Sequence, residues 1–299
     1  MNVSESLVPE RPLRISEMLM ATFRYMRTNP VATLGIGALL STATSAVSAV
    51  VVNGVILGGS SNSALSRLMA GETLTATQSN EITKQITDAA PLLALAAAVS
   101  VLVQLAAMGV MTLGMVESLK GHKLVPGELW RQVPWRRIIG VNLAVVGLML
   151  ASAAIPVALA FSIGGAFGLI LLAGAGLTGL VIAVLTALAV PATIMDGYSV
   201  RQSLQRSILV TRGGLLRTAW MLFVSAIVWQ VFGNFLGTPF SVLFAAFAGG
   251  PSTPAGSAIA NIVTSIVAGA VSLPAVSGMT VLIYLERVRH TRPGQASTE

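Results

Sequence analysis

Residues 218–247 read TAWMLFVSAIVWQVFGNFLGTPFSVLFAAF, and no residue in this run carries a charge. A helix needs about 20 apolar residues to cross about 30 Å of hydrocarbon, so the run is long enough for one membrane span. It belongs to a longer uncharged stretch between Arg217 and Glu286, which the turn-forming residues GGPSTP at 249–254 divide. We predict two spanning helices here, at about 218–247 and 257–286.

Three more uncharged stretches have the same character. They lie between Arg27 and Arg67, between Asp88 and Glu117, and between Arg137 and Asp196. The last is long enough for two helices and has a break at Ser162-Ile163-Gly164-Gly165. The predicted spans are about 31–58, 91–117, 139–162 and 166–195. The prolines inside predicted spans, which should kink them, are Pro156, Pro191, Pro239 and Pro274. We therefore predict an all-α polytopic membrane protein with six transmembrane helices.

The composition excludes several other classes of protein. Of the 299 residues, 54% are hydrophobic and only 10% are charged, whereas soluble domains carry about 25% charged residues. The chain has no cysteine, which excludes disulfides, thiolate catalysis and cysteine-based metal sites. The net charge of +7 is better explained by a membrane surface than by nucleic acid, because of where the cations lie.

The basic residues predict the orientation in the membrane. All of the 18 except Arg67 and Lys84 lie in segments that six spans would place on one side. Lysine and arginine collect in cytoplasmic loops. We therefore expect a cell-membrane protein with both termini in the cytoplasm.

A threefold repeat emerges from the segments that precede each pair of spans. Ser16 is predicted to cap a helix that ends near Met26, a similar segment at 126–137 is broken by Pro134, and a third helix covers 199–212 and ends at Gly213-Gly214. Such helices, apolar on one side and basic on the other, are typical of membrane surfaces. In the last of them the predicted apolar side is Val200, Leu204, Ile208 and Thr211.

We predict a single membrane domain built from three copies of one unit, an interfacial helix followed by a helical hairpin. The three repeats cover 11–119, with an outer insertion at about 59–90, then 120–197 and 198–289, and a tail follows at 290–299.

An acidic residue ends the return span of each repeat. These carboxylates are Glu117, Asp196 and Glu286, and the basic residues expected near them are Arg24, Arg131, Arg201, Arg206 and Arg212. One interpretation is that the pairs hold the helix ends, since a carboxylate at a helix C-terminus opposes the dipole and needs a cation. The other is that they frame a site for lipid headgroups. His122, five residues after Glu117, is interpreted as a solvated loop histidine.

Uncharged polar and small residues inside the spans are interpreted as packing positions. Gln230 and Asn234 lie one turn apart, and they are expected to hydrogen-bond between helices or to line a shared polar cavity. Gly174, Gly176 and Gly179 are expected to permit close helix contact, with substrate contact as the alternative.

Several short motifs resemble those of a bacterial family. The segments RPLRISE at 11–17, PATIMDGYSV at 191–200, SLQRS at 203–207 and LIYLER at 282–287 resemble membrane proteins of the glycerophosphoryl diester phosphodiesterase membrane-domain type. The resemblance covers nearly the whole chain and implies an actinobacterial plasma membrane. It also implies a membrane part that some members carry fused to a separate catalytic domain.

That catalytic domain is not expected in this chain. Phosphodiesterases of this type need paired histidines and several carboxylates around a metal, whereas the two histidines here, His122 and His290, lie in separate segments. No glycine precedes Lys-Ser or Lys-Thr, so a phosphate-binding loop is not predicted either. We expect no catalytic, cofactor-binding or metal-binding residues.

The function predicted from these features is non-enzymatic. We expect an envelope membrane protein that binds or organises anionic lipids or a partner protein at the inner leaflet. An accessory subunit of an envelope-synthesis complex fits the same features. The alternative from another class is a transporter or flippase for a lipid or a lipid-linked glycan.

Overall fold

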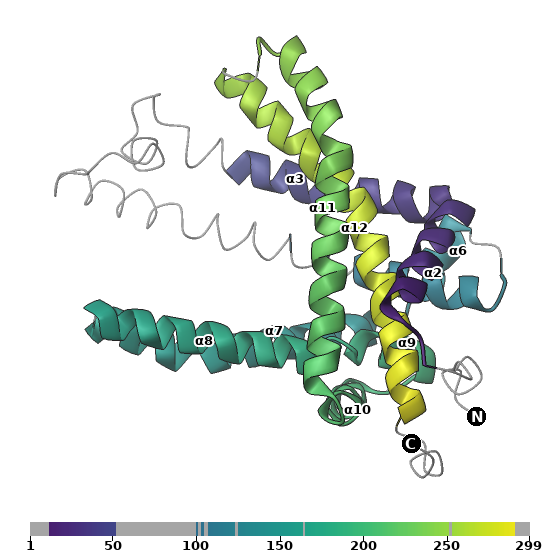
Figure 1. Cartoon of the computed structure of the whole chain (residues 1–299), viewed down its shortest axis with the longest axis vertical. Helices are drawn as coiled ribbons and strands as arrows, with labels where there is room; N and C mark the ends of the chain where they lie inside the picture. The colour runs from purple at the N-terminus through teal and green to yellow at the C-terminus, as the bar shows by residue number, and fades with distance from the viewer. Residues whose placement is uncertain are drawn as a thin grey trace. The chain divides into compact units, whose positions relative to one another are not determined.

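The computed structural model describes residues 12–51, 100, 103–104, 107–122, 125–163, 165–250 and 253–290 (Figure 1). Within these ranges every regular element is a helix. The elements are α2 (Ile15–Thr28), a π-helical turn (Val31–Gly35), α3 (Ile36–Val51), a helix at Ala107–Leu119, α6 (Pro126–Gln132), α7 (Trp135–Ile163), α8 (Gly165–Thr186), α9 (Ala189–Asp196), α10 (Val200–Arg212), α11 (Leu215–Phe247) and α12 (Pro254–His290).

The chain forms two compact units. The first contains Met1–Ile36, Leu105–Val231 and Val271–Glu299, and the second contains Gly37–Gln104 and Phe232–Ala270. Helices α11 and α12 each contribute residues to both units. The predicted outer insertion at 59–90 and the tail beyond His290 lie outside the described residues.

Four helical stretches are long and apolar enough to cross a membrane. They are Trp135–Pro156, Ile170–Asp196, Leu215–Phe247 and Ile259–His290. The described residues are therefore all-helical with four candidate membrane spans, which agrees with the predicted class of helical, multi-pass membrane protein. In the other two predicted spans, the described apolar helices Val31–Ala46 and Ala107–Leu119 are shorter, and much of each predicted span falls outside the described residues.

Two helical hairpins account for these four stretches. In the first unit, α7 and α8 lie side by side, joined at residue 164 (Figure 1). Helices α11 and α12 are joined by a turn in which Gly249 and Gly250 have φ values of 92° and 101°. Backbone of that kind strongly favours glycine, which explains why the predicted turn cluster falls there.

The predicted span at 166–195 is not one continuous helix. Helix α8 ends at Thr186 and α9 begins at Ala189. Pro191 lies just beyond this break, and its ring clashes with the carbonyl four residues earlier in a continuous helix. The chain therefore restarts as α9, which ends at Gly197 with φ of 68°.

Helix α2 begins two residues earlier than predicted and packs on the protein. Its N-cap is Arg14, not Ser16, because the Glu17 carboxylate accepts a hydrogen bond from the Arg14 backbone N–H at 3.0 Å. The buried Tyr25 hydroxyl donates to the Met111 carbonyl at 3.4 Å. Burial raises the pKa of Tyr25, so the phenol stays protonated and available as a donor.

The buried side of α10 matches the predicted one in part. Thr211 is buried, and Val200 and Leu204 are partly buried and pack against the cluster of Val141, Ala189 and Val190. The prediction missed the fully buried Ser203, Ser207 and Val210. The Ser207 hydroxyl donates to the Leu185 carbonyl at 2.6 Å, near the end of α8 where a backbone acceptor lacks a helical partner. Small hydroxyl side chains are therefore among the residues of α10 that face the protein.

Close helix contacts occur at different glycines from those predicted. In the second unit, a Cβ at Gly37 would lie 2.6 Å from the Ala270 carbonyl oxygen, and one at Gly233 would lie 2.9 Å from that of Ala268. By contrast, Gly174, Gly176 and Gly179 of α8 have open space at their Cβ positions. The close-contact interpretation is wrong for α8 because these residues lie on its outer surface.

Replacing Gly233 with leucine should destabilise the α11–α12 hairpin. The added side chain meets backbone that cannot move aside as a flexible side chain would, and such overpacking costs about 1–3 kcal/mol. The matched control is Gly147→Leu in α7, where nothing lies within 4 Å of the Cβ position. Thermal unfolding of both variants in detergent should show a loss for Gly233→Leu only; equal unfolding temperatures would contradict the contact.

Candidate functional site

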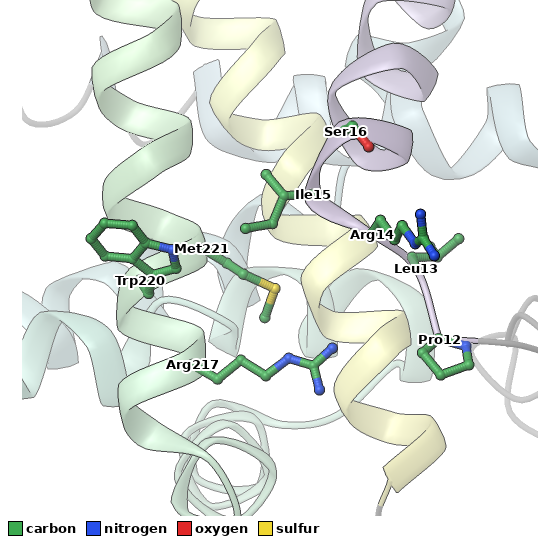
Figure 2. Close-up of a pocket in the computed structure, with 8 residues that line it drawn as sticks. All are labelled: Pro12, Leu13, Arg14, Ile15, Ser16, Arg217, Trp220 and Met221. Carbon is green, nitrogen blue, oxygen red and sulfur yellow. The ribbon is translucent and has the colours of Figure 1, made fainter.

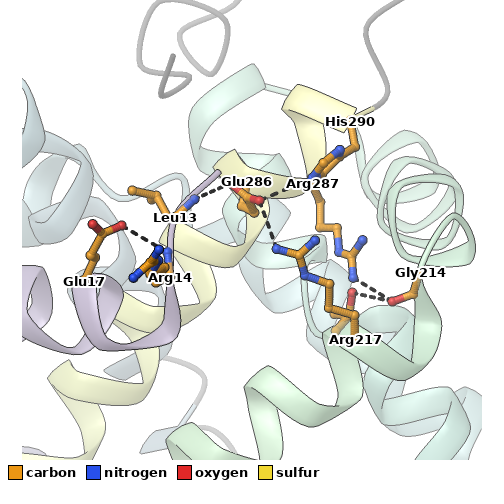
Figure 3. Close-up of polar contacts among 9 residues, drawn as sticks. Leu13, Arg14, Glu17, Gly214, Arg217, Glu286, Arg287 and His290 are labelled. Carbon is orange, nitrogen blue, oxygen red and sulfur yellow. Dashed lines mark hydrogen bonds and ion pairs between the residues drawn. The ribbon is translucent and has the colours of Figure 1, made fainter. Parts of the chain in front are cut away.

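The carboxylate of Glu286 is the most enclosed charge among the predicted site residues. Glu286 has 0% of its surface exposed. Its carboxylate accepts hydrogen bonds from the Leu13 backbone N–H at 3.0 Å and from the Arg217 guanidinium at 3.4 Å (Figure 3). The His290 ring nitrogen lies 3.2 Å away. A buried carboxylate is tolerated only when such partners compensate for its desolvation.

Two arginines share this one carboxylate. Arg217 and Arg287 interact electrostatically with each other and with Glu286, and Figure 3 shows both arginines near the turn before α11. The Arg287 guanidinium donates to the Gly214 carbonyl at 2.7 Å, and its Nε is buried without a hydrogen-bond partner in the part of the chain that the structure describes. The cluster therefore carries an excess of positive charge.

A second polar contact lies on the same helix, α12. The Tyr284 hydroxyl donates a short hydrogen bond to the Asp196 carboxylate at the end of α9. Arg206 of α10 also interacts with the Tyr284 hydroxyl. Asp196 of α9 and Arg206 of α10, both predicted site residues, therefore meet at the Tyr284 hydroxyl of α12.

Glu117 forms a separate and more open cluster. Its carboxylate lies 2.5 Å from the Lys120 ammonium and 2.6 Å from the His122 ring nitrogen. His122 is exposed, as expected for a loop histidine, with 65% of its side chain accessible, but its ring also contacts Glu117. These contacts are local in sequence and close the end of the helix Ala107–Leu119.

The remaining predicted site residues lie on the surface. Arg24, Arg131, Arg201 and Arg212 are exposed. Gln230 and Asn234 are also exposed, on α11. In the part of the chain that the structure describes, only Asp196 and Arg206 of the predicted set are therefore brought together, at Tyr284.

Exposed apolar side chains lie beside several of these cations. On α2, Met20 and Phe23 are 62% and 45% exposed, and at helical spacing they share a surface with the exposed Arg24 and Arg27. On α10, Leu209 is 61% exposed and lies one turn before the exposed Arg212. Each helix thus packs one face on the protein and presents an apolar and basic face outward.

A pocket of about 720 Å³ opens between the segment before α2 and the start of α11 (Figure 2). The lining residues are Pro12, Leu13, Arg14, Ile15, Ser16, Arg217, Trp220 and Met221. Arg14 and Arg217 are the ionisable groups among them. The pocket therefore combines positive charge with an apolar wall.

The arrangement suits binding of an anion. Over the described ranges, no group of three His, Asp or Glu side chains could hold a metal ion. Hydrogen-bond donors on arginine, together with apolar walls, match amphiphilic anions.

Several residues of this site are not predicted from the sequence. They are Leu13, Arg217, Tyr284 and Arg287. Tyr284 and Arg287 flank Glu286 closely in LIYLER, a signal that could have been used. Leu13 contributes its backbone N–H, and a backbone donor cannot be recognised from the pattern of side chains in the sequence.

Comparison of the chain with protein-family models, with curated proteins and with solved structures finds no match. The resemblance to the phosphodiesterase membrane-domain family therefore stays a prediction.

Truncating Glu286 should destabilise the protein far more than truncating Glu117. Glu286→Ala leaves Arg287 buried beside Arg217 without their shared carboxylate, and breaking a buried pair costs about 3–5 kcal/mol. Glu117→Ala removes contacts to exposed partners, which contribute about 1 kcal/mol or less. Equilibrium unfolding of both variants in detergent measures the difference. Similar losses for the two variants would show that burial of Glu286 does not matter.

Proposed function

We propose that this chain is a non-enzymatic membrane protein that binds anionic lipids at the inner leaflet. The observation that carries the proposal is the outward face of α2 and of α10. In both helices exposed apolar side chains stand next to exposed arginines, as with Leu209 and Arg212. Apolar side chains at this position enter the acyl boundary while the guanidinium groups stay with the headgroups.

The packing of α10 supports the same proposal. Its protein-facing side includes two small hydroxyl residues. Ser203 accepts a hydrogen bond from Thr193 at 2.8 Å, and Ser207 donates to the Leu185 carbonyl. The larger apolar residue Leu209 is left outside. A helix that keeps its polar contacts inward and a large apolar side chain outward is suited to lipid rather than to water.

The proposed topology has six spans, three repeats and both termini in the cytoplasm. The element order supports it, because α2, α6 and α10 are short and each precedes a longer helical segment. The distribution of basic residues supports the orientation. In this arrangement α2, α10 and the Glu286 cluster all lie at the inner surface.

We favour lipid binding over lipid transport as the function of this chain. The transporter alternative uses Gln230 and Asn234 as polar residues of an internal cavity, and both side chains are exposed. A partner protein of the envelope remains part of the proposal, because the same outward faces could contact its membrane helices.

Neutralising the outward arginines of α10 should reduce the anionic lipid that co-purifies with the protein. Each basic residue near an anionic surface contributes about 1 kcal/mol, so Arg201→Gln with Arg212→Gln should lower retention several-fold. Mass spectrometry of lipids after gentle detergent purification gives the measurement. Arg67→Gln, at the predicted outer surface, is the control, and unchanged retention in the double variant would contradict the proposal.

The orientation can be tested because the natural chain has no cysteine. A membrane-impermeant maleimide should label Ser61→Cys in intact cells, since this residue lies in the predicted outer insertion. The same reagent should label Ser297→Cys only after permeabilisation. Labelling of Ser297→Cys in intact cells would reverse the proposed topology.

A further inference from the structure

We infer that the pocket between Arg14 and Arg217 binds the phosphate of an anionic phospholipid, with part of an acyl chain along Trp220. The inference rests on the proposed function, because it assumes that this end of the protein meets the inner leaflet. It goes beyond that function by assigning one built site, formed by the segment at 12–16 and the first turns of α11, to one lipid molecule.

The charges of the pocket select an anion. Arg14 and Arg217 are the lining residues with a charge. The nearby Glu286 carboxylate is fully buried behind the pocket and is shared among Arg217, Arg287 and the Leu13 N–H. The region holds Arg14, Arg217 and Arg287 against two carboxylates, Glu286 and Glu17, of which Glu17 accepts from the Arg14 backbone N–H. Two carboxylates cannot neutralise three guanidinium groups, so the region keeps positive charge that a phosphate would balance.

The geometry leaves Arg217 available to a ligand. Half of its side chain is exposed, and its contact with Glu286 is long, at 3.4 Å. Figure 2 shows this side chain extending from α11 toward the segment that carries Ile15. One nitrogen of the Arg217 guanidinium can therefore stay bonded to Glu286 while its other N–H groups donate to a phosphate oxygen.

The start of α2 adds donors on the opposite wall. Ile15 and Ser16 line the pocket and belong to the first turn of this helix. The backbone N–H groups of a first turn lack acceptors within the helix, and the dipole there favours negative charge. These donors add to the two arginines and do not define the site alone.

The apolar wall distinguishes a lipid from a free phosphate. Trp220 and Met221 line the pocket, and Trp220 continues into an exposed apolar face with Leu216 and Phe223, which are 85% and 57% exposed. The rings of Trp220 and Phe223 lie 6.0 Å apart. An acyl chain leaving the pocket would therefore follow α11 without crossing polar surface.

The test uses the full chain in detergent, titrated with phosphatidylglycerol or phosphatidylcholine and followed by native mass spectrometry. Arg14→Gln and Arg217→Gln should each weaken phosphatidylglycerol binding about tenfold, the loss expected for one charge-assisted hydrogen bond. Binding of phosphatidylcholine should change little. Arg136→Gln, on an exposed residue near the start of α7 that does not line the pocket, is the matched control.

Two further arms separate the alternatives. Arg217→Gln also removes a partner of Glu286 and can unfold the chain, so Arg14→Gln, on an exposed residue, decides the case if that happens. Trp220→Ala should weaken phosphatidylglycerol but not glycerol phosphate. If glycerol phosphate displaces phosphatidylglycerol at equal concentration, the ligand is a free phosphate and the lipid inference is overturned.

Failure of the site and failure of the proposed function give different results. If the unaltered chain shows no preference for phosphatidylglycerol over phosphatidylcholine, the proposed function fails and the site with it. If the preference exists but Arg14→Gln and Arg217→Gln keep it, or if Arg136→Gln loses it equally, only the assignment of this pocket is overturned.

Discussion

The buried carboxylate of Glu286 is the interaction on which the first unit depends most. It joins the segment before α2, the start of α11 and the end of α12, which are far apart in the sequence. A charge with no exposed surface is stable only if its partners are held in place. The same contacts that satisfy it therefore also fix where these three segments meet, and they form the wall of the pocket beside Arg217.

A second constraint is the break between α8 and α9. The proline at 191 interrupts the helix, and the interruption leaves backbone carbonyls near Leu185 in need of donors. Ser207 supplies one, and this contact turns the hydroxyl face of α10 toward the protein. Leu209, Arg201 and Arg212 of α10 are then left outside, so a local defect in a predicted span helps to decide which surface of a neighbouring helix can meet lipid.

These two constraints connect the fold to lipid binding. Compensation of Glu286 gathers more arginines than carboxylates at one end of the unit. The orientation of α10 and α2 places exposed apolar residues next to further arginines. Exposed apolar surface is unfavourable in water, whereas apolar side chains next to positive charge match the boundary between headgroups and acyl chains.

The sequence by itself determined the class of protein, the four long helices, the turn at Gly249-Gly250 and the break at Pro134. Each depends on local properties, namely hydropathy over a window, absence of charge, and the backbone preferences of glycine and proline. The partners of Glu286, the role of Tyr284 toward Asp196, and the buried side of α10 were decided only by the tertiary structure. Hydropathy does not predict that Ser203 and Ser207 are fully buried, because their burial depends on partners in other helices, the Thr193 hydroxyl and the Leu185 carbonyl. Likewise, a sequence shows that a carboxylate needs a cation, but which of many arginines approaches it depends on how distant helices meet.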